Sequence, residues 1–248
     1  ALKTARKWAT ETKGPDAYEI VYARDSFHGR TMGALSVNGQ DEYRKGFTPL
    51  LAGTREAVFN DLDSFAAKMN ANTSAVIIEP VQGEGGIIPG TKEFLQGLRD
   101  LCDAHNAALI FDEVQCGMGR IGQIHAYHHY GVTPDLIALA KGLGAGFPVG
   151  AFMGKKEFTK HITPGSHGST YGGNPLACAA VRAVLKEVKN PDFLQNVRAT
   201  GDYLRNRLNQ FAEETNAFEN VRGMGLMIAA DYVKGDADVL KKQLLKNG

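Results

Sequence analysis

Residues 134–150 read PDLIALAKGLGAGFPVG, and the prediction of the fold starts from this stretch. An apolar run suited to a buried strand, Leu136–Ala140, ends at a lysine, and glycines follow almost at once. Lysine is rarely buried without a partner, and closely spaced glycines disfavour both helix and strand. The pattern predicts a strand that ends at Lys141, followed by a loop whose backbone can approach another molecule closely.

Similar apolar runs recur along the chain, with helical patterns between them. Strands are predicted at Glu19–Ala23, Val58–Asn60, Ser74–Glu79, Ala108–Glu113, Leu136–Ala140, Val149–Met153 and Leu226–Tyr232. Helices are predicted at Ala1–Thr12, near Asp61–Met69, around Phe94–Cys102, and at Pro175–Lys189 and Asp192–Glu214. Strands without polar alternation, separated by amphipathic helices, indicate an α/β fold whose largely parallel central sheet is covered by helices on both faces.

The pattern changes near residue 190, which predicts two domains. We expect a large domain over residues 1–189 and the beginning of a small C-terminal α+β domain over residues 190–248. In the second long helix, an apolar stripe marks the face expected to be buried: Phe193, Val197, Leu204, Leu208 and Phe211. The chain opens and closes within helical patterns and has no initiator Met. We therefore expect a portion of a longer protein, with both domains incomplete.

Composition argues against several classes of function. The formal net charge of the 248 residues is +1, so no overall field attracts nucleic acid or an anionic membrane. No apolar run approaches the length that spans a bilayer. The three cysteines are odd in number and far apart, which favours buried thiols in a reducing cytoplasm over disulfides or a zinc site. We expect a cytoplasmic protein without a metal.

Polar residues that could take part in catalysis follow the predicted strands: Glu79, Asp112 and Lys141. Ligands of parallel sheets bind beyond the carboxyl ends of the strands. Adjacent strand ends would therefore bring the carboxylate of Asp112 and the amine of Lys141 to one crevice. Burial there would lower the lysine pKa and make the amine a nucleophile. Pyridoxal phosphate needs both groups, a lysine for its aldehyde and a carboxylate for its ring nitrogen.

These residues also allow other interpretations. Lys141 could extend to solvent at a strand end, and Asp112 could cap a helix. The glycine spacing of 142–150 fits neither a dinucleotide-binding motif nor a phosphate-binding loop. His125, His128 and His129 have helical spacing that could hold a metal, but a helix surface or a dimer contact is favoured, because acidic and thiolate ligands are missing nearby.

Motifs over the whole chain resemble the class III, ornithine-type, pyridoxal-phosphate-dependent aminotransferases. They read SFHGRT, EPVQGEGG, DEVQCGMGRIG, PDLIALAKGLGAGFP and HGSTYGGNPLA, in the order found in that family. The resemblance implies a fold-type I transferase with pyridoxal 5′-phosphate as cofactor. Within the family, SFHGRT and STYGGNPLAC are most similar to members that act on N-acetylornithine.

The resemblance also implies roles for cofactor-binding residues. Lys141 would bond to the aldehyde of the cofactor and move protons during the reaction. Asp112 would hold the ring nitrogen, and Gln115 would lie near the ring hydroxyl. Val114 and Phe27 would pack on opposite ring faces.

Further roles concern substrates and assembly. Arg30 resembles the arginine that binds the carboxylate of the amino donor. Glu84 resembles an acidic switch that pairs with a second arginine while that donor is bound and moves away for 2-oxoglutarate. Thr170 would reach the cofactor phosphate of the neighbouring subunit, which requires a homodimer. The second arginine and a phosphate-binding turn before the first helix are missing from the sequence, which fits truncation at both ends.

Transfer of the terminal amine of N-acetylornithine to 2-oxoglutarate, a step of arginine biosynthesis, is the function that this resemblance implies. Ornithine, 4-aminobutyrate and succinylornithine remain alternative donors. A catalytically silent scaffold or regulatory fragment with the same fold is an alternative of another class.

Overall fold

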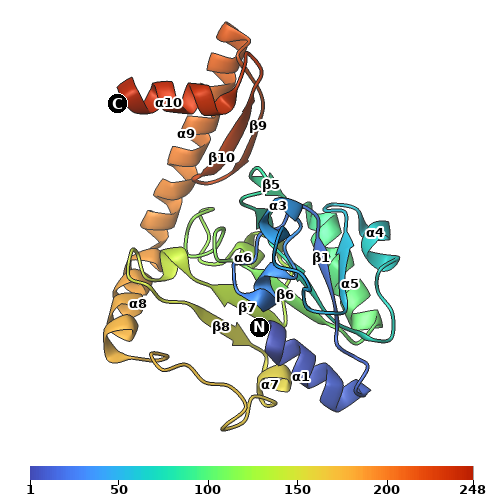
Figure 1. The fold of residues 1–248 in the computed structure, drawn as a ribbon. Coiled ribbons are helices and arrows are strands. Elements are labelled where there is room, and N and C mark those ends of the chain that lie inside the picture. Colours follow the sequence, from blue (N-terminus) through green and yellow to red (C-terminus); the bar gives the residue numbers. More distant parts are fainter. Residues whose placement is uncertain (248) are drawn as a thin grey trace.

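The computed structural model describes residues 1–247 (Figure 1). A six-stranded sheet in the order β2-β1-β3-β6-β7-β8 forms its centre. Its strands are β1 (Glu19–Ala23), β2 (Thr54–Ala57), β3 (Thr73–Ile78), β6 (Ala108–Asp112), β7 (Leu136–Leu139) and β8 (Ala151–Gly154). All neighbouring strands run parallel except β8, which is antiparallel to β7. The predicted α/β fold with a largely parallel sheet is confirmed.

The inner strands are apolar throughout because each contributes to two cores. In β6, Ala108 and Ile110 belong to one buried cluster, whereas Leu109 and Phe111 belong to the cluster on the opposite face. Successive side chains of a strand point to opposite faces, so a strand covered on both sides has no solvent-facing position. This is the physical reason for the apolar runs.

Helices cover both faces of the sheet. On one face, α1 (Leu2–Lys13) packs against α7 (Lys156–Thr159), and the rings of Trp8 and Phe158 lie 4.5 Å apart. On the other face lie α4 (Leu62–Ala66) and α5 (Lys92–Ala104), with the ring centroids of Phe65 and Phe94 at 5.5 Å. Thr91 caps α5 by accepting a hydrogen bond from the Phe94 amide.

The C-terminal part extends away from the sheet (Figure 1). It comprises α8 (Pro175–Val188), α9 (Pro191–Thr215), β9 (Phe218–Met224), β10 (Met227–Tyr232) and α10 (Ala237–Asn247), and the antiparallel β9–β10 hairpin packs along α9. The buried stripe predicted for α9 is largely wrong. Val197 is buried, but Phe193, Leu204 and Phe211 are more than 40% exposed, because the hairpin covers only one narrow face.

Two strand predictions need correction. Val58–Asn60 forms a turn, and the edge strand β2 lies just before it. The strand β9 was not predicted, because FENVRGM carries charged residues and glycine in place of an apolar run. The remaining short elements are α2 (Met32–Leu35), α3 (Asp41–Arg44), α6 (Ala126–Tyr130), the 3₁₀ turn Lys141–Leu143, β4 (Val81–Gln82) and β5 (Ile88–Pro89).

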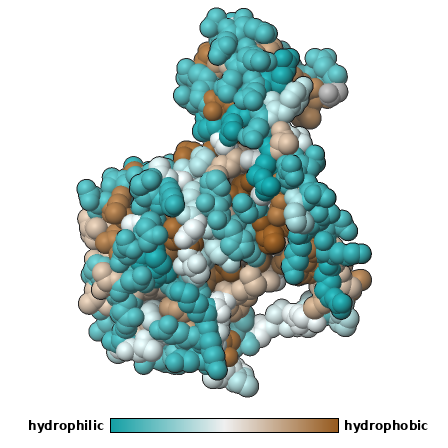
Figure 2. Space-filling model, turned by 180° about the vertical axis from the view of Figure 1, so that it is seen from behind, coloured by the Kyte–Doolittle hydropathy of each residue, from teal (hydrophilic) through white to brown (hydrophobic). Residues whose placement is uncertain are grey.

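The loop between α7 and α8 stands away from the body of the molecule (Figure 2). Within residues 1–247, none of the helices has the length and apolar character to cross a bilayer. Three or more histidine, cysteine or carboxylate side chains do not gather into a metal-binding cluster anywhere in that range. The three histidines on and beside α6 are not part of such a cluster within those residues.

Candidate active site

The residues predicted at strand ends lie at one edge of the sheet. Asp112 is the last residue of β6 and pairs with Ala138 in the parallel strand β7. Glu79 directly follows β3, and Lys141 follows β7 by two residues. Because β3, β6 and β7 are parallel neighbours, their carboxyl ends meet at this edge. The predicted placement of the three side chains at adjacent strand ends is confirmed.

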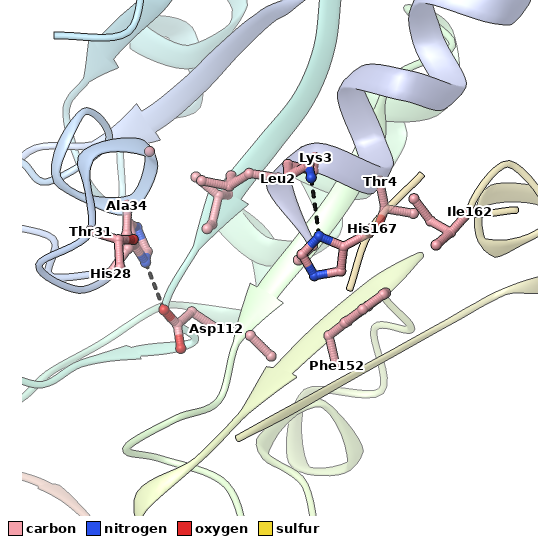
Figure 3. Close-up of a pocket in the computed structure, with 14 residues that line it drawn as sticks. Leu2, Lys3, Thr4, His28, Thr31, Ala34, Asp112, Phe152, Ile162 and His167 are labelled. Carbon is pink, nitrogen blue, oxygen red and sulfur yellow. Dashed lines mark hydrogen bonds and ion pairs between the residues drawn. The ribbon is translucent and has the colours of Figure 1, made fainter. Parts of the chain in front are cut away.

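Asp112 is buried, and both of its carboxylate oxygens are engaged. The backbone amide of Val114 donates to Oδ1 at 3.0 Å, and Nδ1 of His28 lies 2.8 Å from Oδ2. A carboxylate only accepts hydrogen bonds, so the imidazole donates through Nδ1. The His28 side chain is 2% exposed, and its Nε2 is buried without a partner in residues 1–247. Figure 3 shows the pair on the wall of a cavity.

Lys141 begins the short 3₁₀ turn after β7 with a backbone φ of 42°. This left-handed conformation is unfavourable for a residue with a side chain and typically marks a functional or tightly constrained position. The side chain is exposed and forms neither a hydrogen bond nor an ion pair within residues 1–247. The dry pocket that was predicted for the amine is therefore not present around it.

Asp112 and Lys141 line two different cavities in this structure, and the single crevice expected for them stays a prediction. Asp112 lines a cavity of about 410 Å³ together with His28, Ala138 and the first residues of α1. Lys141 lines a second cavity, of about 350 Å³, with Gln115, Arg120 and Leu226.

Gln115 and Glu84 are brought together on the Lys141 side. Gln115 Nε2 donates to Glu84 Oε1 at 3.0 Å, which joins the turn after β6 to the loop after β4. Gly83 makes this approach possible, since a Cβ there would lie 2.3 Å from the Gln115 amide oxygen. Val114 is half-buried between Asp112 and Gln115 in the same turn.

Glu79 connects two loops of the site through hydrogen bonds to its carboxylate. It is buried, and its carboxylate accepts hydrogen bonds from the amides of Phe27 at 2.9 Å and Gly83 at 3.0 Å. Burial raises the pKa of this carboxyl above its ordinary value, and the nearby His28 opposes that shift. The contacts hold the backbone beside Phe27 and the loop that carries Glu84 in a fixed relation.

The remaining predicted residues lie further out. Arg30 is exposed, with its guanidinium over the ring of Tyr43 at 4.2 Å and over that of Phe27 at 5.3 Å. Thr170 is exposed in the loop between α7 and α8 and lines neither of the two cavities. Cys116 is fully buried near Glu113, which raises the pKa of its thiol well above the ordinary value, so it is no nucleophile.

Sequence reasoning gave no site role to His28. Its partner Asp112 lies 84 residues away in the chain, and an isolated histidine carries no local signal for such a contact. Glu79 could be placed at a strand end, but its two amide donors come from separate loops.

Comparison with known proteins supplies further evidence. The family model described as Aminotransferase class-III matches residues 1–248. The chain is 51% identical over 242 residues to the acetylornithine aminotransferase of Clostridium acetobutylicum, covering 97% of this chain and 62% of the relative. It is 48% identical over 244 residues to a succinylornithine transaminase/acetylornithine aminotransferase of Pseudomonas aeruginosa, covering 97% of this chain and 60% of the relative.

Solved structures agree with this grouping. The ornithine aminotransferase of Toxoplasma gondii superposes with a TM-score of 0.94 at 33% identity, over 100% of this chain and 60% of that chain. The N-acetylornithine aminotransferase of Stenotrophomonas maltophilia superposes with a TM-score of 0.83 at 34% identity, over the same shares of the two chains. The chain thus spans about three fifths of the length of these relatives.

Proposed function

Because the chain belongs to the class III aminotransferases, we propose that its protein is a pyridoxal-phosphate-dependent transaminase that moves the terminal amine of N-acetylornithine to 2-oxoglutarate. The observation that carries this proposal is the identity of 48–51% with curated relatives whose names specify acetylornithine aminotransferase. One of these names also specifies succinylornithine transaminase, so succinylornithine is the second candidate donor. The reaction would serve arginine biosynthesis in the cytoplasm.

The two chemical groups at the strand ends, a carboxylate and an amine, suit pyridoxal phosphate. Asp112 is a buried carboxylate held by only a histidine and an amide, which suits a protonated ring nitrogen. Lys141 is an amine without a partner in the described residues, which suits an aldehyde. When bound, the cofactor supplies an electron-withdrawing ring, which no side chain provides.

The residues proposed to bind the cofactor would then have the following tasks. Lys141 Nζ would hold the cofactor and would carry the proton that leaves the carbon bearing the donor amine. Asp112 would keep the proton on the ring nitrogen, and His28 holds Asp112 through Nδ1. Phe27 and Val114 would exclude water from the cofactor ring, and Gln115 would donate to its hydroxyl.

Substrate exchange would use the two charged residues at the rim. Arg30 is suited to a bidentate contact with the donor carboxylate. Glu84 accepts from Gln115 in this structure and would exchange that contact for an arginine when the donor is bound. Thr170, exposed in its loop, would contact the cofactor phosphate of a second subunit in a homodimer.

Amine transfer can be tested directly in the protein at its natural full length. We expect glutamate to form from 2-oxoglutarate fastest with N-acetylornithine, when succinylornithine, ornithine and 4-aminobutyrate are compared in one coupled assay. A clear preference for another donor would replace the proposed substrate and keep the reaction class.

A second experiment tests the cofactor and its lysine. After borohydride reduction, mass spectrometry should find the cofactor on the peptide that contains Lys141. Lys141→Ala should lose the adduct, and Lys160→Ala, an exposed lysine outside the site, should keep it. A wild-type protein that takes up no cofactor would instead support the silent scaffold.

A further inference from the structure

Tyr43 lies against the residue proposed to bind the donor carboxylate. The carbon at the centre of the Arg30 guanidinium is 4.2 Å from the centroid of the Tyr43 ring. The ring of Phe27 packs edge-on to Tyr43, with centroids 5.4 Å apart and planes at 77°. Arg30 also lies 5.3 Å from the Phe27 centroid. The three side chains therefore pack as one cluster, in which Tyr43 contacts both of the others.

The position of Tyr43 is fixed by the next residue. Tyr43 belongs to α3, a single helical turn, and Arg44 of that turn donates to the hydroxyl of Tyr22 at 2.8 Å. Tyr22 is a buried residue of β1. Arg44 also pairs with Asp41 and lies 4.0 Å from Glu56 in β2. These contacts attach the turn to the edge of the sheet, so Tyr43 is a rigid support for Arg30.

The geometry leaves the guanidinium available to a ligand. A guanidinium donates hydrogen bonds in its own plane, while its face stacks on an aromatic ring. Arg30 is exposed, and its side chain has neither a hydrogen bond nor a carboxylate partner within residues 1–247. A long exposed side chain otherwise loses rotamer entropy when it binds, and prior ordering reduces that cost.

We propose that Tyr43 is a specificity-determining positioning residue, which orders Arg30 on its ring so that the guanidinium donates two parallel hydrogen bonds to the carboxylate of the amino donor. This inference rests on the proposed function, in which Arg30 binds that carboxylate. It adds a residue outside the recognised motifs and predicts that Tyr43 acts on substrates bearing a carboxylate.

The experiment compares Tyr43→Leu, which removes the aromatic face, with Tyr43→Phe, which keeps it. Tyr18→Leu is the matched control. Tyr18 makes a similar contact elsewhere in the molecule, with the Arg6 guanidinium 5.2 Å from the centroid of its ring. The kinetic constants for N-acetylornithine are measured in the full-length holoenzyme. Calorimetry measures binding of N-acetylnorvaline, which has the carboxylate but no terminal amine, and of its uncharged amide.

We expect Tyr43→Leu to raise the KM for N-acetylornithine and the Kd for N-acetylnorvaline by about three- to fivefold, the size of a partly exposed cation–π contact. The kcat should change less than about twofold, because the lost contact acts on binding and not on the reacting atoms. Tyr43→Phe and Tyr18→Leu should match the wild type. Binding of the amide should be the same in all four proteins.

Two results would overturn the inference while the proposed function stands. One is wild-type affinity for N-acetylnorvaline in Tyr43→Leu. The other is an equal loss of affinity for N-acetylnorvaline and its amide, which would indicate general distortion of the site. If the wild-type protein neither transfers the amine nor binds N-acetylnorvaline, the proposed function fails and the inference fails with it.

Discussion

Glu113 holds the functional turn after β6 in place. Its side chain is fully buried and accepts hydrogen bonds from the amides of Ala126 at 2.7 Å and Tyr127 at 2.8 Å, at the start of α6. Its own amide donates to the carbonyl of Ala138 in β7. One residue thus links the end of β6 to the neighbouring strand and to α6, and it lies beside Asp112.

Removal of this carboxylate should destabilise the whole protein. Glu113→Ala leaves two amides without an acceptor, and each buried unsatisfied group costs about 1–3 kcal/mol. We expect the free energy of unfolding to fall by about 2–4 kcal/mol in urea titrations. Glu214→Ala, at an exposed position of α9, should change it by less than about 0.5 kcal/mol. Equal stability of the two variants would contradict this role.

At the scale of elements, the packing of α9 on the hairpin depends on a glycine pair. Gly201 is buried in α9, and a Cβ there would lie 2.1 Å from the carbonyl oxygen of Gly225, in the turn between β9 and β10. Gly225 has a φ of 52°, in the left-handed region. The helix and the turn therefore approach so closely that position 201 has no room for a side chain, while a Cβ at Gly225 would lie 2.6 Å from the backbone of Ile121.

This contact reverses the usual effect of alanine in a helix. Alanine is favoured over glycine in a helix by about 1 kcal/mol. We nevertheless expect Gly201→Ala to lower the Tm and to speed amide exchange in β9 and β10, because rigid backbone lies opposite. Gly97→Ala in α5 is the comparison, since its nearest neighbour is the movable side chain of Leu62. A Tm of Gly201→Ala at or above that of Gly97→Ala would contradict the packing argument.

At the scale of the molecule, the β9–β10 hairpin and its turn help to connect the C-terminal arm, residues 175–247, to the sheet-containing body. Arg222 of β9 donates through Nε to the carbonyl of Gly86 at 2.9 Å and pairs with Asp231 of β10 at 2.7 Å. The amide of Leu226 donates to the carbonyl of Arg120 at 3.0 Å. These contacts place the hairpin beside the loop of Glu84 and in the lining of the Lys141 cavity.

Loss of the arginine contact should loosen the arm without unfolding the body. We expect Arg222→Ala to increase amide exchange in residues 218–232 by about three- to tenfold, since hydrogen bonds of a charged donor contribute about 1.5 kcal/mol or more. The amides of β3 and β6 should keep their protection. Arg207→Ala, in which an exposed residue of α9 is changed, is the control. Unchanged exchange in the hairpin of Arg222→Ala would show that other contacts hold the arm.

The sequence predicted the sheet well because strands buried on both faces leave an unmistakable apolar run. Glu19–Ala23 matches β1 in both bounds, and the predictions for β3, β6 and β7 differ from the observed strands by a residue or so at an end. The edge strand β2 and the hairpin strand β9 escaped this reasoning, whereas β8 and β10 were predicted with ends that differ by at most two residues. The edge strand β2 reads TREA and β9 reads FENVRGM, since a strand with an open face tolerates polar residues.

For this protein, the sequence alone determined which chemical groups end adjacent strands: a carboxylate at Asp112 and an amine at Lys141. Only the tertiary structure decided where those groups point. The direction of a side chain at a strand end depends on the dihedral angles of the following turn, as at Lys141, and on partners distant in the chain, as with His28 for Asp112. Neither is encoded in a local pattern, because each arises when separate segments pack together.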